Sequence, residues 1–291
     1  MKIFSPVIYY CLLWPLSRMP FWFLHGFSSV LYFFLYYIIG YRKKVVAENL
    51  QKSFPEKTEA ERKAIAKEFY KHLSDVFLEG VKAFNISKDE LRKHLVCKNP
   101  ELIRKYYDAG KEVVITVGHY GSWELFLTGI NLYIRHRAVV IYQPLANAYL
   151  DKKLREKRSE YRTLMLPTKE VKTFYASPRK ELCATVFAID QSPPHPDRCY
   201  WMQFLNQETG VLFGAEKYAK DYDMPVVYAR IRREKRGYYS IEFVDVSPQP
   251  RETAHGAITE KVTRLLENDI IETPAYWLWS HKRWKHKRPQ S

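Results

Sequence analysis

The chain has 291 residues, 46% of them hydrophobic, which is enough for a sizeable core and excludes a disordered protein. Its 47 Lys and Arg against 32 Asp and Glu give a net charge of +15, so we expect an anionic partner: nucleic acid, an anionic bilayer or an acidic carrier protein. The 22 Tyr, 16 Phe and 7 Trp, with a dense block near the N-terminus, favour a lipid interface. Four cysteines without a CxxC pair are typical of reduced thiols in a protein that faces the cytosol.

The N-terminal segment is almost free of charge. Residues 7–40 carry a single charged side chain, Arg18. Within them, residues 21–40 form a run long enough to cross a bilayer as a helix, and the Arg-Lys-Lys triplet that follows predicts a cytoplasmic location for the rest of the chain. The alternative is a pair of amphipathic helices that lie in the interface and are broken near Pro15 and Pro20. Both interpretations predict a membrane-bound protein.

The helices after this segment have recognisable first residues. Thr58 and Glu61 form a capping box that opens a long helix ending near residue 84, and Ser87 opens a second helix in the same way. Pro100 at a first helical position opens a third. The expected elements that follow are a strand at 113–117, a helix at 125–133, a strand at 138–142, helices at 151–162 and 170–175, a strand at 184–190, a helix at 214–221, strands at 226–231 and 239–246, and a helix at 254–271.

Strand and helix alternate along residues 113–271, which predicts an α/β sheet with helices on both faces. No internal repeat, low-complexity tract or Gly/Ser linker divides this part of the sequence. We therefore expect two parts, a membrane anchor at residues 1–44 and one folded domain at residues 45–291.

Polar side chains cluster at the turn between the strand at 113–117 and the next helix. His119 ends the strand, Ser122 is placed to cap the helix, and Glu124 falls in the first helical turn, where a carboxylate is electrostatically favoured. Glu124 can hold the imidazole in one tautomer while His119 accepts a proton from a hydroxyl, which is the logic of a dyad that activates an alcohol. A capping Ser, a first-turn acid and a strand-ending His without catalytic roles are equally compatible with this stretch alone.

Two charged residues outside this turn are candidates for the same site. Arg158 lies on the helix after the next strand, where it can stabilise an oxyanion or hold a phosphate, although its neighbours also suit a solvated helix face. Asp190 ends an apolar strand, so we expect its carboxylate at the edge of the sheet where the dyad also lies. The aromatic-rich loop 193–207 that follows suits either an apolar pocket for a chain-like ligand or an ordinary surface loop.

Two further clusters bear on cofactors and partners. His195, Asp197 and Cys199 include zinc-ligand types, but their spacing matches no usual ligand pair, so we expect no metal and no cofactor. Residues 277–289 mix three Trp with a dense cationic run, which suits a bilayer surface or an acidic carrier protein, and residues 230–233 add a second basic cluster. No recognised nucleic-acid-binding motif supports nucleic acid as a partner.

In their order and spacing, these features resemble the bacterial lipid A biosynthesis acyltransferases, the late acyltransferases of the lysophospholipid acyltransferase superfamily. The resemblance covers nearly the whole chain and begins with the membrane helix and the basic residues after it. The matching motifs are Asn49-Leu50, Phe54-Pro55-Glu56, Glu61-Arg62, the His-x4-Glu block from His119 to Glu124, Tyr142 with Pro144, Asp190-Gln191, Phe213-Gly214, and the closing Trp279, Arg283, Trp284, Lys285, Arg288 and Pro289.

The resemblance implies a single mixed sheet flanked by helices, as in glycerolipid acyltransferases, after an N-terminal membrane helix. It implies an inner-membrane enzyme whose acyltransferase domain, on the cytoplasmic face, moves a fatty acyl chain from acyl carrier protein to a hydroxyl of a lipid A precursor. His119 would be the general base, Glu124 its partner, and Arg158 a functionally important arginine, although Arg155 and Arg162 are close by in the sequence. The expected substrate-binding residues are Tyr120, Gly121, Ser122, Asp190 and Arg283.

The expected mechanism is direct attack of the acceptor hydroxyl on the thioester, with backbone amides of the Gly121–Ser122 turn or Arg158 stabilising the oxyanion. Gln143 and Ser192 depart from the family pattern, which often has Arg and Asp there, and this affects the substrate more than the reaction. Three alternatives stay open: transfer to an aminolipid, lysophospholipid or glycolipid, a metal-dependent hydrolase, and a membrane-anchored binding protein without turnover. The sequence also leaves coenzyme A open as the donor.

Overall fold

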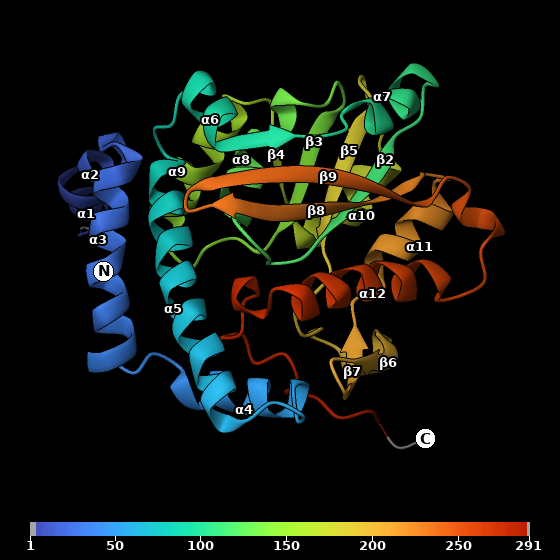
Figure 1. Ribbon diagram of the computed structural model, residues 1–291. Coiled ribbons are helices and arrows are strands. Elements are labelled where there is room, and N and C mark those ends of the chain that lie inside the picture. Colours follow the sequence, from blue (N-terminus) through green and yellow to red (C-terminus); the bar gives the residue numbers. More distant parts are fainter. Residues whose placement is uncertain (1–3, 290–291) are drawn as a thin grey trace.

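The computed structural model describes residues 4–289, and its centre is a large mixed sheet (Figure 1). The strands are β1 (Leu95–Cys97), β2 (Val113–Val117), β3 (Arg137–Tyr142), β4 (Leu164–Pro167), β5 (Cys183–Ala188), β6 (Tyr200–Phe204), β7 (Gln207–Val211), β8 (Val226–Lys235) and β9 (Tyr238–Ser247). The central sheet has the order β1-β9-β8-β2-β5-β3-β4, and β6 with β7 forms a separate hairpin. Only the β8–β9 pair of the central sheet is antiparallel, so the carboxyl ends of β2, β3, β4, β5 and β8 meet at one edge. This confirms the expected single mixed sheet.

Helices cover both faces of this sheet, as the alternation of strand and helix predicts. The helices are α1 (Phe4–Ile8), α2 (Trp14–Arg18), α3 (Phe21–Phe33), α4 (Lys43–Ser53), α5 (Glu59–Lys82), α6 (Lys88–His94), α7 (Glu101–Asp108), α8 (Trp123–Gly129), α9 (Ala148–Ser159), α10 (Val171–Ala176), α11 (Gly214–Asp221) and α12 (Ala257–Glu272). Alternate residues of β2 enter two cores: Val113 and Ile115 pack with α6, α7 and α8, whereas Val114 packs with the cluster fed by α4, α5, α10, α11 and α12. β2 is therefore buried on both faces, which explains its β-branched composition.

Two of the three expected N-terminal helix caps, at Thr58 and Ser87, form in the structure, and the third, at Ser122, does not. Thr58 accepts a hydrogen bond from the Glu61 amide, and the Glu61 side chain accepts one from the Thr58 amide, so the capping box of α5 is confirmed. Ser87 caps α6 through the Glu90 amide. Ser122 stands at the N-cap position of α8, but its buried hydroxyl makes no hydrogen bond, so it does not cap that helix.

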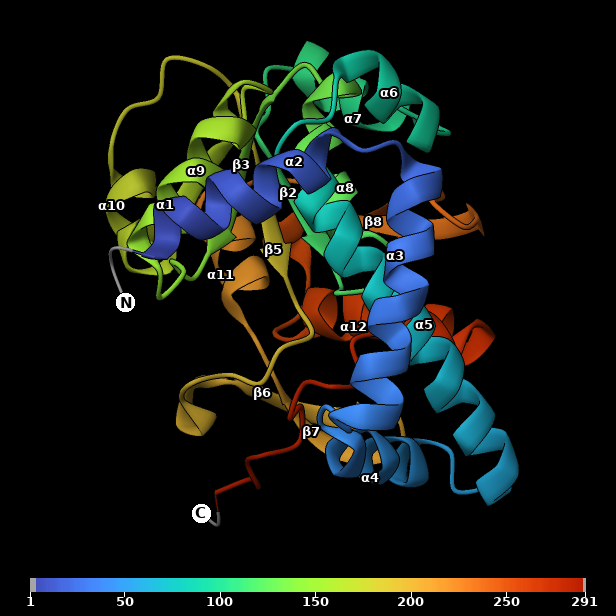
Figure 2. The same ribbon diagram turned by 90° about the vertical axis from the view of Figure 1, so that its left-hand side faces the viewer.

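The N-terminal helices form two segments joined at a bend. A π-helical turn at Tyr9–Leu13 links α1 to α2, and a second at Phe34–Ile38 extends α3. The bend falls at Pro20, as expected, whereas Pro15 lies inside α2 and does not interrupt it. Figure 2 shows α1 and α2 lying across the molecule and α3 running alongside α5. Phe21–Ile38 is long and apolar enough to cross a membrane, but 28% of it is buried inside the protein.

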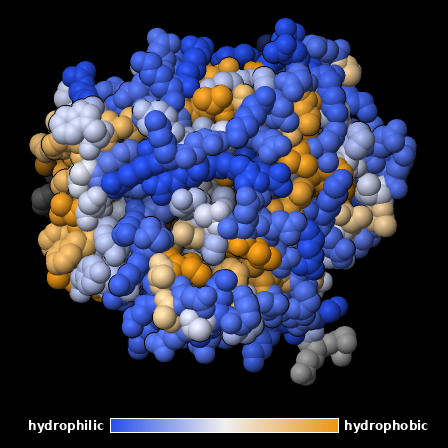
Figure 3. Space-filling view, in the orientation of Figure 1, coloured by the Kyte–Doolittle hydropathy of each residue, from blue (hydrophilic) through white to orange (hydrophobic). Residues whose placement is uncertain are grey.

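The outer side of these helices is an apolar surface, which appears in orange at the left of Figure 3. Its exposed large side chains are Val7, Ile8, Tyr10, Leu12, Trp14, Met19, Trp22, Phe23, Phe27, Val30, Phe33, Phe34, Tyr37, Ile38 and Ile39. A contiguous exposed surface of this kind marks a contact with a membrane or another protein.

Four short strands, β1, β4, β6 and β7, were not expected from the sequence. β1 has three residues and β4 has four, too few for a clear alternation of apolar and polar positions. β6 occupies part of the expected loop 193–207 and pairs with β7. Its Phe204 is buried and stacks on Trp284 from the C-terminal segment, so these aromatic residues build a core contact.

Candidate active site

The register of β2 and β5 brings His119 and Asp190 together. The two strands are parallel, with Val117 opposite Ala188, and each polar residue follows two positions later. The segments after β2 and β5 therefore leave the sheet at the same edge, and His119 and Asp190 occupy equivalent positions in them. The expected position of Asp190 at the edge that carries His119 is confirmed.

Three hydrogen bonds fix the carboxylate of Asp190. Its Oδ1 accepts from Nδ1 of His119 at 2.7 Å, and its Oδ2 accepts from the His119 backbone amide at 2.7 Å and from the Trp277 indole at 2.8 Å. The side-chain amide of Gln191 lies 3.2 Å from Nε2 of His119 and can only donate through its nitrogen. The imidazole thus carries its proton on Nδ1 and presents a lone pair on Nε2, the tautomer of a general base.

The charges of this pair support each other. Burial alone would lower the pKa of His119, but the charge and hydrogen bond of Asp190, with a smaller effect from the charge of Glu124, raise it above its usual value. Burial would raise the pKa of Asp190, yet the charge and hydrogen bonds of His119 and the Trp277 indole lower it to about 2. Asp190 therefore stays ionised at neutral pH and stabilises the imidazolium that forms when Nε2 takes a proton.

Glu124 pairs with Arg158 instead of His119. Nη2 of Arg158 lies 2.7 Å from Oε2 of Glu124, and Nη1 lies 3.4 Å from the sulfur of Met165. The expected role of Glu124, to hold the imidazole tautomer, is taken by Asp190 in the structure. Nε of Arg158 is buried without a hydrogen-bond partner. His119, Glu124 and Arg158 therefore lie in one site, but they belong to two separate pairs. One pair is His119 with Asp190, and the other is Glu124 with Arg158.

A pocket of about 320 Å³ opens beside these two pairs. Its polar side chains include His119, Glu124, Arg158 and Gln191. The remaining lining residues are mostly apolar and comprise Val117, Gly118, Trp123, Leu127, Val140, Ile141, Tyr142, Gln143, Leu145, Leu154, Val186 and Ala188. An apolar pocket with a few polar groups at one side suits a chain-like ligand whose reactive group meets His119. A larger hollow of about 420 Å³, between α4 and α5, does not include these groups.

The turn after β2 is held by the C-terminal segment. The Gly121 amide donates to the Tyr276 carbonyl at 3.0 Å, and the Leu278 amide donates to the His119 carbonyl at 3.1 Å. The hydroxyl of Tyr120 donates to carbonyls at the end of α12, so Tyr120 and Gly121 lie outside the pocket lining. The Gly121 amide already has an acceptor and Gly121 and Ser122 lie outside the pocket lining, whereas Arg158 lines the pocket, so Arg158 is the better placed of the two expected oxyanion groups.

Gly121 is required by the geometry of this turn. Its φ of 62° lies in the left-handed region, and a Cβ there would stand 2.8 Å from Cγ2 of Ile231. Its carbonyl accepts a hydrogen bond from Nε2 of His72 on α5 at 3.2 Å. Burial, together with the charge of Arg233, lowers the pKa of His72 to about 4, so the ring is neutral and donates from Nε2.

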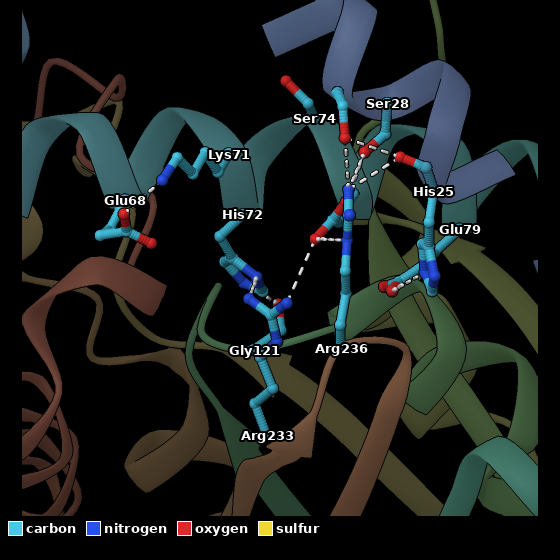
Figure 4. A network of polar contacts seen from close by, with 12 residues as sticks. His25, Ser28, Glu68, Lys71, His72, Ser74, Glu79, Gly121, Arg233 and Arg236 are labelled. Atoms are coloured by element: carbon cyan, nitrogen blue, oxygen red, sulfur yellow. Dashed lines mark hydrogen bonds and ion pairs between the residues drawn. The ribbon is translucent and has the colours of Figure 1, made fainter. Parts of the chain in front are cut away.

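His72 belongs to a polar network that reaches α3 (Figure 4). Arg233 donates to Nδ1 of His72 at 3.4 Å and to Asp75 at 3.2 Å. Asp75 also binds Arg236 and the hydroxyl of Ser28 on α3. Buried polar groups therefore connect α3 to the turn that carries His119.

The C-terminal segment is an integral part of the fold. Trp277 and Trp279 are among the largest fully buried side chains of the protein. The side-chain amide of Asn49 donates to the carbonyls of Trp279 and His281, and Arg42 donates to the carbonyl of Ser280. The expected substrate-binding residue Arg283 follows them and is buried outside the pocket lining.

The second basic cluster expected at residues 230–233 is neutralised within the protein. Arg230 pairs with Asp269 at 2.8 Å, Arg232 with Glu272 at 2.8 Å and Arg233 with Asp75 at 3.2 Å. These arginines hold β8 against α12 and α5. Their charge is thus less available to an anionic partner than that of the C-terminal segment.

No group of three or more His, Cys, Asp or Glu side chains within residues 4–289 has the arrangement of a metal site. His195 is exposed, and Cys199 contacts the carbonyl of Pro196 at 3.1 Å. The cysteines at positions 11, 97, 183 and 199 are all unpaired.

Sequence reasoning missed Gln191, Trp277 and His72 as parts of the site. In the sequence Gln191 is the second residue of the Asp190-Gln191 motif and Trp277 belongs to a basic, Trp-rich run, and neither pattern predicts a contact with the His119–Asp190 pair. His72 lies on the inner face of α5 at helical spacing from core residues, where a single buried His carries no sequence signal. The indole of Trp277 reaches Asp190 because the C-terminal segment passes beneath the turn at Tyr120, a contact between residues 87 positions apart.

The fold and the site define an α/β protein whose His–Asp pair, at the carboxyl edge of the sheet, faces an apolar pocket. The family model described as bacterial lipid A biosynthesis acyltransferase matches residues 2–286, so the chain belongs to this family and is an acyltransferase of lipid A biosynthesis with a lipid substrate. The lipid A biosynthesis acyltransferase of Haemophilus influenzae (strain ATCC 51907 / DSM 11121 / KW20 / Rd) is 24% identical to it over 269 residues, which cover 90% of this chain and 82% of the relative. The expected family is confirmed.

Proposed function

We propose that this enzyme transfers a fatty acyl group from the thioester of an acyl carrier protein to a hydroxyl of a lipid A precursor at the cytoplasmic face of the inner membrane. The observation that carries the proposal is the His119–Asp190 pair, which leaves Nε2 of His119 unprotonated beside an apolar pocket, so that a substrate hydroxyl that replaces the Gln191 amide at Nε2 meets a base. Membership of the lipid A biosynthesis acyltransferase family supports the acyl transfer and the lipid A-type acceptor in this proposal.

The chemistry follows from the tautomer of His119. Nε2 takes the proton of the acceptor hydroxyl while its oxygen attacks the thioester carbonyl, and Asp190 stabilises the imidazolium. Arg158, held by Glu124, faces the developing oxyanion. When the tetrahedral intermediate collapses, the C–S bond breaks and His119 returns its proton to the leaving sulfur. The products are an ester and a thiol, and no Ser or Cys nucleophile takes part.

The expected partners fit the surface of the enzyme. The pocket wall, with Leu127, Ile141 and Leu154 among its residues, would hold the acyl chain. The net charge of +15 would attract an acidic carrier protein and an anionic membrane surface. We propose residues 1–44 as the membrane-binding part and residues 45–291 as the acyltransferase domain.

The N-terminal helices fit an interfacial position better than a membrane span. Arg236, whose side chain is 41% exposed, binds Ser28 and Ser29 near the middle of Phe21–Ile38. A charged, partly exposed side chain at the centre of a span would stand in hydrocarbon, where it is costly. An interfacial α3 instead presents its apolar side to the bilayer and keeps Arg236 near water.

The test is an acyl transfer assay with purified enzyme, labelled acyl carrier protein and a lipid A precursor. Replacing His119→Ala removes the base, so we expect kcat/KM to fall by about 10²–10⁴-fold. His195→Ala, an exposed histidine outside the pocket, is the matched control and should keep the wild-type rate. Unchanged transfer by His119→Ala, with the control intact, would refute the assignment of the base.

A further inference from the structure

Arg283 is a buried cation that the protein leaves without a partner. The residue is 2% exposed, and its Nε has no hydrogen-bond acceptor. Within residues 4–289 the guanidinium also has no carboxylate at ion-pair distance and no other hydrogen bond. An unpaired buried charge destabilises a fold, so its retention calls for a ligand that neutralises it.

The nearest acid in the site does not fill this role. Both oxygens of Asp190 are engaged by His119 and Trp277. Burial lowers the pKa of Arg283 to about 10, although the charges of Asp190 and Cys199 oppose this change. At neutral pH Arg283 is therefore still charged, close to the catalytic pair but not neutralised by it.

A second unpartnered donor, Ser192, is connected to Arg283 through His281. The hydroxyl of Ser192 is buried without a hydrogen bond, and the Ser192 amide donates to Nε2 of His281 at 3.0 Å. The Arg283 amide donates to the carbonyl of the same His281 at 2.9 Å. Burial lowers the pKa of His281 to about 4, so this residue positions both neighbours without adding charge.

We propose that Arg283 and Ser192 form a phosphate-binding subsite next to the catalytic pair. A guanidinium with free N–H groups matches phosphate oxygens bidentately, and a serine hydroxyl adds a further donor. The exposed Lys282 and Lys285 beside it make the approach strongly positive, which favours the higher charge of a phosphate over a single carboxylate. The phosphate comes either from the lipid acceptor or from the phosphorylated arm that joins the thioester to its carrier.

The position of the subsite connects it to the substrate. Ser192 follows Gln191, which contacts His119, and the carbonyl of His281 is held by Asn49 on α4, shortly after the apolar helix α3. A phosphate bound here would anchor a substrate between the membrane-binding helices and Nε2 of His119. The role in catalysis rests on the proposed acyl transfer, whereas phosphate binding itself does not.

The first test measures thermal unfolding of the purified full chain in inorganic phosphate and in chloride at equal ionic strength. Arg283→Met should lose the specific rise in Tm that phosphate gives the wild type, and in chloride its Tm should equal or exceed the wild-type value because an uncompensated charge is gone. Lys172→Met, which removes the same charge from the exposed side of α10, should respond like the wild type. Phosphate also stabilises folded proteins in general, and this non-specific rise in Tm should be equal in the wild type and the two variants.

The second test compares KM values for an acceptor with and without its phosphate, and for the carrier-bound donor. If the lipid supplies the phosphate, Arg283→Met raises KM for the phosphorylated acceptor at least about tenfold and leaves the dephosphorylated acceptor unchanged. A rise confined to the donor assigns the subsite to the carrier arm. Ser192→Ala should change the same KM in the same direction, by a smaller factor.

Two results would overturn the subsite. One is a full phosphate response in Arg283→Met, and the other is a loss of several degrees in chloride with unchanged KM values, which marks Arg283 as structural. Absence of acyl transfer by the wild type would refute the proposed function, but the unfolding measurement would still decide whether phosphate binds.

Discussion

A single proton position on His119 determines what this site can do. With the proton held on Nδ1 by Asp190, Nε2 keeps the lone pair that the Gln191 amide contacts, and only this nitrogen could accept the hydroxyl proton of a substrate. Asp190 accepts two hydrogen bonds from His119, one from the imidazole and one from the backbone amide. Trp277 orients the carboxylate from the other side.

Asp190→Asn tests this arrangement through the pH profile. Burial is the largest single influence on the pKa of His119 and lowers it, but the charge and hydrogen bond of Asp190, together with the charge of Glu124, raise it above the ordinary value. Without the charge of Asp190 the pKa should therefore fall below that value. Because the base must be unprotonated, the acid limb of kcat/KM should move to lower pH. In addition, kcat should fall by up to about 10⁴-fold, because Asn does not hold the imidazole proton on Nδ1 as Asp190 does.

Asp197→Asn is the control for this change, because Asp197 is an exposed acid on the loop that follows Asp190. It should leave both the rate and the acid limb in place. Glu124→Gln should shift the limb in the same direction by less, since its charge has the smaller effect on His119. An acid limb that does not move in Asp190→Asn would contradict the role given to this pair.

At the scale of elements, α5 is the part that joins the N-terminal helix α3 to the site. Its His72 contacts the carbonyl of Gly121, and its Asp75 binds Ser28 on α3 (Figure 4). The ion pair of Lys71 with Glu68 lies on its exposed side. A charged helix packed along α3 in this way is compatible with the proposed interfacial position of α3.

An interfacial α3 predicts that residues on both sides of it lie in the cytoplasm. Arg18, exposed just before α3, provides the position to test. We expect Arg18→Cys, with Cys11 and Cys199 replaced by Ser, to react with a membrane-impermeant maleimide in inside-out vesicles and not in intact cells. A membrane span with a cytoplasmic body would give labelling of intact cells.

The matched control for this experiment is Lys44→Cys in the same background, after α3. Lys44 is cytoplasmic in both arrangements, so it should label only in inside-out vesicles. Labelling of Arg18→Cys from outside, with Lys44→Cys labelled from inside, would establish a span and remove the interfacial proposal.

At the scale of the whole molecule, the excess positive charge is unevenly placed. The arginines of β8 are neutralised by Asp75, Asp269 and Glu272. The C-terminal segment instead exposes Lys282 and Lys285 without ion-pair partners in the described structure. An acidic carrier protein is therefore expected to approach from this side.

Electrostatic attraction of this kind weakens with salt. Between about 0.05 and 0.5 M NaCl we expect KM for the carrier-bound donor to rise by about tenfold or more, because counterions screen exposed charges over distances of several ångströms. A short acyl thioester without a carrier should show little change and serves as the control in the same assay. Equal salt effects on both donors would argue against carrier docking on the basic surface.

The sequence alone determined the local structure and the residues at the edge of the sheet. The β-branched run before His119 predicts a strand buried on both faces, and the capping box at Thr58 fixes the start of α5; both depend on neighbours within a few residues. The positions of His119 and Asp190 at strand ends could be inferred in the same way. The family motifs added Arg158 and Arg283 but not their contacts.

Only the tertiary structure decided which of these groups meet. Glu124, five residues from His119, is the obvious partner in the sequence, yet β5 lies next to β2 and carries Asp190 to Nδ1 of His119 across 71 residues. Glu124 turns to Arg158, and Trp277 arrives from the far end of the chain. The physical reason is that strand order and register are set by the packing of the whole sheet, which no local pattern of residues encodes.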